Sequence, residues 1–225
     1  MNINQYILPL NPHEQYHFDD YILSSSNKQA FDAVNNWSET WGHLPYANSL
    51  LVSGPKSSGK TYLAKIWQGK SQSYFFEKNQ DFKLLIIQGQ SSFVIEDIEH
   101  WDEELLLHYF NAIHESGKYL LLTTGRAHNN FSLKDIESRI NSIATVKIEA
   151  PDDKLLEILL FKLFSQASIR SSMQVQNYLL SHLPRKFSEI INFVKEINEF
   201  SLSNKKNLTL SLIKNYLDSK NISKL

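Results

Sequence analysis

Residues 54 to 61 place two glycines, a lysine and a threonine at a spacing that suits phosphate chemistry. The segment has the pattern G-x-x-x-x-G-K-T and consists of Gly54, Pro55, Lys56, Ser57, Ser58, Gly59, Lys60 and Thr61. Glycines let the backbone bend so that successive N–H groups point at one anion. Lys60 would reach the β- and γ-phosphates of a nucleotide, and the Thr61 hydroxyl would bind Mg²⁺. The sequence therefore predicts a loop that holds a nucleotide and Mg²⁺.

A phosphate-binding loop lies between a strand and a helix, and the segments on either side of this loop have those patterns. Residues 49–53 before it are largely apolar and predict a buried strand, whereas residues 60–69 after it have the apolar spacing of a helix. A helix that begins at the loop turns its N-terminus, with its partial positive charge, toward the same anion. We include Tyr62, which follows the loop, among the candidate nucleotide-binding residues.

Two acids follow the next strong strand pattern. The apolar residues 93–95 run into Glu96 and Asp97. In phosphate-loop enzymes an acidic strand end holds Mg²⁺, directly or through water, and positions the attacking water. We therefore predict that Glu96 is the metal-side acid and that Asp97 orients the water. Glutamate is one methylene longer than the aspartate usual at the first position, so Mg²⁺-nucleotide binding is expected to survive better than efficient hydrolysis.

A third apolar segment, residues 119–122, leads into Thr123 and Thr124. A hydroxyl at that strand end, above all that of Thr124, is a candidate contact for the γ-phosphate or the attacking water. The alternative is structural, because threonine is a favourable strand residue wherever it occurs.

The elements that must position these residues alternate between strand and helix patterns. This alternation predicts an α/β fold with a parallel sheet covered by helices on both faces. The expected strands are 49–53, 93–96, 119–124 and 144–149, with 73–76, 83–88 or both supplying the second strand, and the expected helices are 27–41, 60–69, 103–116 and 133–140.

The pattern changes at Pro151, after which only helices are expected. They cover residues 152–166, 173–183, 186–200 and 208–219. We therefore expect a flexible tail over residues 1–12, a nucleotide-binding α/β domain over 13–150 and a small all-helical domain over 151–225.

Composition narrows the classes of function. The 225 residues include no cysteine, so disulfides, thiolate catalysis and cysteine-bound metals are excluded. No apolar run approaches the ~20 residues of a membrane span, and the N-terminus lacks the pattern of a signal peptide, so we expect a cytoplasmic protein that does not bind membranes. The formal net charge is −1 with scattered basic residues, which argues against direct sequence-specific DNA binding.

The order of these features resembles the AAA+ ATPases, and within them the DnaA branch of bacterial replication initiators. Four further segments match the branch in the same order. Residues 17–22 with 27–30 resemble the segment that enters the adenine pocket, and residues 96–99 stand where initiators carry Asp-Asp-Ile-Gln. Residues 138–140 resemble a Ser-Arg-Phe motif, and residues 183–187 lie where a lid arginine is found.

The resemblance implies an AAA+ domain with a five-stranded parallel sheet, followed by a helical lid domain, and ADP or ATP with Mg²⁺ as ligand. It implies that Tyr21 and Ile22 contact the adenine and that Arg185 contacts the phosphates of the bound nucleotide. Arg139 would act in trans on the nucleotide of a neighbouring subunit. The alternative for Arg139 is a surface arginine paired with Glu137 or Asp135, and for Arg185 a surface arginine of the lid.

Within that branch, the chain is most similar to the short Hda-type regulators of DnaA. Their clamp-docking peptide, Gln-Leu-Ser-Leu-Pro-Leu, resembles the segment formed by Gln5, Tyr6, Ile7, Leu8, Pro9 and Leu10. A short extended peptide of this kind buries its apolar side chains in a pocket, and its proline restricts the free chain. We expect no DNA-binding helix-turn-helix after residue 208 and no separate N-terminal interaction domain.

That resemblance implies a negative regulator of replication initiation. It would dock on the DNA polymerase III sliding clamp and stimulate ATP hydrolysis by DnaA through Arg139, its own ATPase activity being weak. Two alternatives stay open: an independent AAA+ ATPase or loader that remodels a replication protein, and a nucleotide-binding interaction module without hydrolysis. Self-association into a homo-oligomer is also left open.

Overall fold

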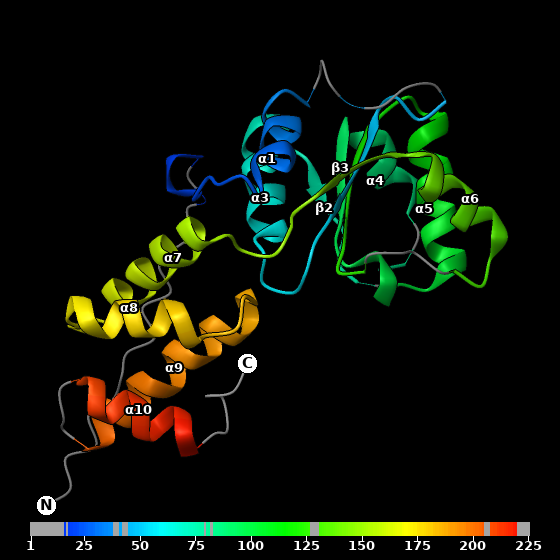
Figure 1. The fold of residues 1–225 in the computed structure, drawn as a ribbon. Helices are drawn as coiled ribbons and strands as arrows, with labels where there is room; N and C mark the ends of the chain where they lie inside the picture. The colour runs from blue at the N-terminus through cyan, green and yellow to red at the C-terminus, as the bar shows by residue number, and fades with distance from the viewer. Residues whose placement is uncertain are drawn as a thin grey trace, which may run out of the picture.

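The central element of the fold is a five-stranded sheet whose strands are all parallel, in the order β2-β3-β4-β1-β5. In this computed structural model the described residues are 16, 18–37, 41, 45–78, 80–81, 83–126, 131–204 and 208–219. The strands are β1 (Ser49–Ser53), β2 (Tyr74–Phe75), β3 (Ser92–Ile95), β4 (Tyr119–Thr124) and β5 (Ala144–Lys147). The predicted class, a parallel sheet flanked by helices with a helical part after it, is confirmed (Figure 1).

Helices cover both faces of the sheet because its strands are apolar on both sides, as buried parallel strands are. Leu50 and Val52 of β1 pack against α1 (Lys28–Asn35) and α3 (Lys60–Ser71). Leu51, between them, points to the opposite face. That face is covered by α4 (Leu84–Gly89), α5 (Glu103–Glu115) and α6 (Lys134–Ser142). There are also two short 3-10 helices, η1 (Phe18–Asp20) and η2 (Ile98–His100), and Ile98 of η2 is buried in the same core as Leu51.

Two segments are candidates for the second strand. The prediction is wrong for residues 83–88, because this segment forms helix α4, whereas the candidate 73–76 contains β2, which lies at one edge of the sheet. Short apolar runs fit either structure by periodicity. Here Ile87 is fully buried while Leu84 is 51% exposed, so only one side of the segment faces the core. The Lys118 ammonium donates to the carbonyls of Ile87, Gln88 and Gln90 and thereby satisfies the helix end.

The helix expected over residues 27–41 is shorter than predicted, since α1 ends at Asn35. Trp41 instead folds back, and its indole N–H donates to the Ala33 carbonyl at 2.9 Å. Its ring lies 4.9 Å from that of Trp67, centre to centre. Tertiary packing of large aromatic rings therefore decides where this helix ends.

The C-terminal helices form a bundle with its own core. They are α7 (Asp153–Gln166), α8 (Met173–His182), α9 (Phe187–Asn204) and α10 (Leu210–Ser219). Asp152 and Ser172 accept hydrogen bonds from the backbone N–H groups of Leu155 and Val175, which is how such residues start helices. Helix α9 runs four residues beyond the predicted end at 200. No helix among the described residues has the length and apolar character needed to cross a bilayer.

The bundle core gives a first test of the fold. Ile197 of α9 is fully buried in it, so Ile197→Ala leaves a cavity and is expected to lower the free energy of unfolding by about 2–5 kcal/mol. Met173 is 73% exposed, and Met173→Ala is expected to change it by less than about 0.5 kcal/mol. Urea denaturation followed by circular dichroism measures both. Equal stability of the two variants would contradict this packing.

Candidate nucleotide-binding site

The predicted phosphate loop links the end of β1 to the start of α3 at the carboxyl edge of the sheet. Ligands bind at this edge in open α/β folds. The loop needs left-handed backbone at two positions, Ser57 (φ 64°) and Gly59 (φ 95°). A side chain at Gly54 would approach Cβ of Ile148 to 2.9 Å. The loop therefore bends tightly against the chain that follows β5, and glycine is required where the contact is closest.

Lys60, the first residue of α3, is held inside the loop and is only 7% exposed. Its ammonium donates to the carbonyls of Gly54 at 2.9 Å and Pro55 at 3.1 Å. Burial lowers the pKa of this amine, while the negative charges of Asp97, Glu99 and Glu96 oppose that shift. Phosphate oxygens would offer the ammonium charge-assisted hydrogen bonds, which are stronger than those to carbonyls. The loop is built to take an anion at this point.

The acids predicted at the end of β3 lie opposite the loop. Glu96 interacts with the Thr61 hydroxyl, and burial raises the pKa of its carboxyl group. Its Oε1 is buried and has no hydrogen-bond partner among the described residues. A carboxylate oxygen and a hydroxyl at one place are the hard ligands that Mg²⁺ takes beside nucleotide phosphates. The pair Thr61 and Glu96 therefore fits the predicted metal role.

Asp97 sits at a strained turn beside the loop. It has positive φ (50°), and its N–H donates to Oγ1 of Thr123 at 2.9 Å. It lines a wide cleft of about 1060 Å³ together with the phosphate loop. The structure thus brings Asp97 to the side of the cleft where a γ-phosphate and its attacking water would lie.

Thr124, the predicted phosphate contact, lies at the end of β4 with its polar groups bound to nearby backbone. It is fully buried, its Oγ1 accepts the N–H of Arg126 at 3.2 Å, and its carbonyl accepts the N–H of Gly54 at 3.1 Å. The residues after β4 that line the cleft are Gly125 and Arg126. Thr124 therefore supports the cleft wall, and its contact with a phosphate stays a prediction.

A second pocket, of about 270 Å³, lies between the α/β part and the bundle. Tyr21 and Ile22 line it, as expected for an adenine pocket, and so does Tyr62. The ring of Tyr21 lies 5.5 Å from that of Tyr62, and burial raises the pKa of its phenol, which stays neutral. The bundle contributes apolar residues, with Leu155, Leu159, Leu163 and Phe187 among them. A flat aromatic base suits such walls.

The two predicted arginines lie on different elements. Arg185 is exposed, forms an ion pair with Asp153 and lines neither the cleft nor the adenine-type pocket, so its role at the phosphates stays a prediction. Arg139 lies on the outer side of α6, where its guanidinium donates to the Asp135 carbonyl at 3.1 Å. Glu137 is paired with Lys134 instead. Arg139 makes no ion pair with any residue that the structure describes.

Sequence reasoning missed several residues of the site. Glu99 lines the cleft and accepts the N–H of Gly125 at 2.7 Å, and Tyr16 lines it from the other side. Lys162 of α7 lines the second pocket and donates to the Asp20 carbonyl at 3.0 Å. Glu99 lies in the segment 96–99 that resembles an initiator motif, but that resemblance gives it no role. Tyr16 and Lys162 carry no motif-level signal, because they reach the site only through folding.

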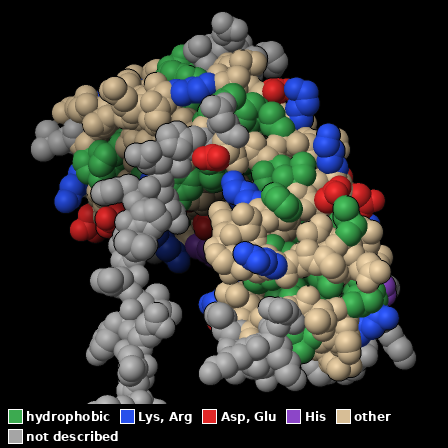
Figure 2. Space-filling view, turned by 90° about the vertical axis from the view of Figure 1, so that its left-hand side faces the viewer, with side chains coloured by type: hydrophobic (Ala, Val, Ile, Leu, Met, Phe, Trp, Pro, Cys, Tyr) green, Lys and Arg blue, Asp and Glu red, His purple; other side chains and the backbone are tan. Residues whose placement is uncertain are grey.

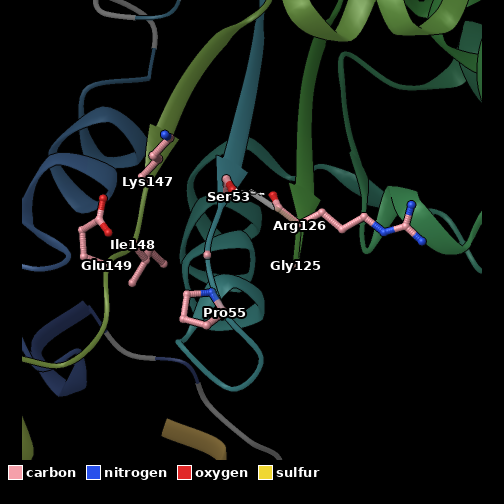
Figure 3. Close-up of a pocket in the computed structure, with 8 residues that line it drawn as sticks. Ser53, Pro55, Gly125, Arg126, Lys147, Ile148 and Glu149 are labelled. Atoms are coloured by element: carbon pink, nitrogen blue, oxygen red, sulfur yellow. Dashed lines mark hydrogen bonds between the residues drawn. The ribbon is translucent and has the colours of Figure 1, made fainter. Parts of the chain in front are cut away.

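A smaller cavity, of about 250 Å³, lies beside the phosphate loop at the ends of β1, β4 and β5. Figure 3 shows that the Arg126 side chain extends away from Ser53 and Pro55, while its carbonyl accepts the Ser53 hydroxyl at 3.0 Å. Lys147, Ile148 and Glu149, at and just after the end of β5, line its other side (Figure 3). The predicted clamp-docking residues 5–10 lie outside the described residues.

This chain is similar to DnaA proteins and, in its lid, to the Hda family. The model of the "Hda, lid domain" family matches residues 160–217. DnaA of Lactiplantibacillus plantarum is 25% identical over 95% of this chain and 52% of its own length. The chain spans about half the length of the curated relatives it matches.

Solved structures show the same fold. Domain III of the DnaA protein from Thermotoga maritima superposes with a TM-score of 0.70 at 18% identity, over 97% of this chain and all of that one. AMPPCP-bound DnaA from Aquifex aeolicus gives a TM-score of 0.64 at 18% identity, over 84% of this chain and 66% of that one. The chain is therefore similar to AAA+ proteins of the DnaA branch in sequence and fold, and its lid is similar to that of Hda.

Proposed function

We propose that this protein is a nucleotide-binding regulator of replication initiation that docks on the sliding clamp and stimulates ATP hydrolysis by DnaA. The observation that carries the proposal is an Hda-type lid on a DnaA-like core. The tail adds the peptide Gln5 to Leu10, which resembles a clamp-docking motif. The ligand is ADP or ATP with Mg²⁺, because an enclosed lysine, a tight glycine turn and an apolar pocket lie next to one another.

The chain's own residues divide the work of holding the nucleotide. The loop N–H groups and Lys60 bind the phosphates, Thr61 and Glu96 hold Mg²⁺, and the pocket around Tyr21 holds the base. When bound, Mg²⁺ neutralises charge on the phosphates. Asp97 would orient a water at the cleft, although the longer Glu96 favours binding over turnover. Slow hydrolysis by the protein itself is consistent with a regulator, and fast clamp-independent hydrolysis would instead favour a motor.

Arg139 is the residue proposed to act on DnaA. Ile136 and Ile140 anchor α6 in the core, so the helix is rigid and Arg139 projects from its outer side. The guanidinium donates to a backbone carbonyl and is not neutralised by a described carboxylate. Such a group can stabilise the charge that develops on phosphates bound by a neighbouring subunit.

The nucleotide assignment is tested by Lys60→Ala. Removing a charge-assisted contact is expected to weaken Mg-ADP and Mg-ATP binding by about 10- to 100-fold, measured by isothermal titration calorimetry. Lys70→Ala, at the far exposed end of the same helix, is the matched control and should bind as the wild type does. Unchanged affinity in Lys60→Ala, or no heat with the wild type at millimolar nucleotide, would overturn the assignment.

Clamp docking is tested by a pull-down on immobilised sliding clamp. The double variant Gln5→Ala with Leu8→Ala loses the polar and apolar contacts proposed for the peptide, and retention is expected to fall at least about tenfold. The control changes Asn2 and Asn4, which precede the motif in the same tail, to alanine. Retention equal to that of the wild type would remove the clamp from the proposal.

The action on DnaA is tested by the release of phosphate from DnaA-ATP in the presence of clamp-loaded DNA. Arg139→Ala is expected to lose nearly all stimulation, since arginine fingers contribute about 10³ to 10⁵ in rate. Arg139→Lys keeps the charge without the planar fork and should recover little. Lys134→Ala, exposed on the same helix, is the control. Stimulation by Arg139→Ala at the wild-type level would assign the role to another residue.

A further inference from the structure

The two threonines at the end of β4 use their hydroxyls inside the protein. Thr123 and Thr124 are fully buried, and each Oγ1 accepts a backbone N–H, at 2.9 Å and 3.2 Å. Gly125 follows the strand (Figure 3) and borders the phosphate cleft, but it has no side chain. Arg126, which also borders the cleft, carries only donors. A hydrogen-bond acceptor for an attacking water must therefore come from another segment.

Glu99 of η2 brings an acceptor to this strand end. Its Oε1 accepts the N–H of Gly125 at 2.7 Å, and a Cβ on Gly125 would come within 2.8 Å of the same oxygen. The carboxylate thus occupies the space that a side chain at the end of β4 would fill. Glu99 lines the cleft together with Lys60 and Thr61 of the phosphate loop.

We propose that Glu99 is a catalytic residue for ATP hydrolysis by this protein, and that its carboxylate accepts the proton of the water that attacks the γ-phosphate. The inference rests on the proposed nucleotide site. It goes beyond that site by assigning the proton acceptor, whereas Asp97 only orients the water.

The second oxygen of Glu99 has the hydrogen-bonding capacity that this role requires. Oε2 is buried and accepts no hydrogen bond from any described residue. A buried acceptor without a donor costs free energy, and a water placed beside the nucleotide supplies the donor. Catalytic hydrogen bonds often form fully only when the substrate is bound. With Oε1 anchored on Gly125, the carboxylate keeps one orientation while Oε2 serves the water.

Asp97, the other acid at this place, is held less firmly than Glu99. It is exposed, and it takes part in the hydrogen bonds of the described residues through its backbone alone. A group that must meet a reacting atom loses rate when its position is loose. Burial lowers the pKa of the Lys60 amine, and the negative charge of Glu99 is among those that oppose this shift. The Glu99 carboxylate therefore lies near the group proposed to bind the β- and γ-phosphates.

The proposed step consumes only ATP and water. The water oxygen forms a bond to the γ-phosphorus, and the bond from that phosphorus to the bridging oxygen breaks, leaving its electron pair on ADP. The water proton passes to Oε2 of Glu99 and then to the released phosphate, so the carboxylate is regenerated. A positioned base of this kind contributes about 10²- to 10⁴-fold in rate.

The experiment follows phosphate release from γ-labelled Mg-ATP in a single turnover, with the full chain in excess. Glu99→Gln keeps an acceptor for Gly125 but cannot take a proton, so its rate is expected to fall about 100-fold or more. Its affinity for Mg-AMPPCP, from calorimetry, should stay within about twofold of wild type. Glu99→Ala should be equally slow, and added formate should restore part of its rate by supplying a carboxylate.

Glu103→Gln is the matched control, because Glu103 also accepts backbone N–H groups, those of Ser132 and Leu133, but lies outside the described lining of the cleft. It should hydrolyse ATP at the wild-type rate, and thermal melting shows that each variant is folded.

Three results would overturn the inference alone. They are a rate of Glu99→Gln within about threefold of wild type, a loss of Mg-AMPPCP binding in that variant, and a Glu99→Ala protein that formate does not accelerate. A wild type that binds Mg-AMPPCP but releases no phosphate from ATP would also overturn it while leaving the nucleotide site intact. A wild type that binds no nucleotide would overturn the proposed site, and the inference with it.

Discussion

A lysine ammonium enclosed at the first turn of α3 is the constraint around which this molecule is arranged. Lys60 is 7% exposed and its Nζ is held by two carbonyls of its own loop. A buried positive charge is costly unless it is hydrogen-bonded and compensated. The acids at the end of β3 supply the compensating charge across the cleft. The phosphate loop, α3 and the end of β3 must therefore keep their relative positions, because otherwise the buried charge of Lys60 would lose its compensation.

The parallel sheet holds the loop, the helix and the strand end in these positions. Strand β4 lies between β1 and β3, so the acids of the β3 end and the loop after β1 face each other across the β4 end. Hydrogen bonds join the residues after β3 to the end of β4: the N–H of Asp97 donates to Thr123, and Glu99 accepts the N–H of Gly125. A side chain on Gly125 would come within 2.8 Å of Glu99 Oε1. The cleft is thus a property of three adjacent strand ends and of the glycine that lets them approach.

The lid completes the pocket around Tyr21, because residues of both the α/β part and the bundle line it. Helix α7 closes it with a row of leucines and links to the core through Lys162 and Asp20 and through Ser25 and Asp152. These links are few and polar, so a ligand that touches both parts can set how they pack. The lid also exposes some apolar residues, Ile158 and Phe161 among them. Figure 2 shows several hydrophobic side chains on one face of the molecule.

The sequence alone determined the sheet, the phosphate loop and the order of elements, because these depend on local patterns. Apolar runs predict β1 and β4 to the residue, and the loop requires only glycines, a lysine and a threonine at fixed spacing. Tertiary structure decided the rest. Residues 84–89 became a helix because one side of the segment faces the core. Tyr16 and Lys162 line the two pockets only because distant segments fold together. Periodicity records which side of an element is buried, but it does not record which other element will cover it.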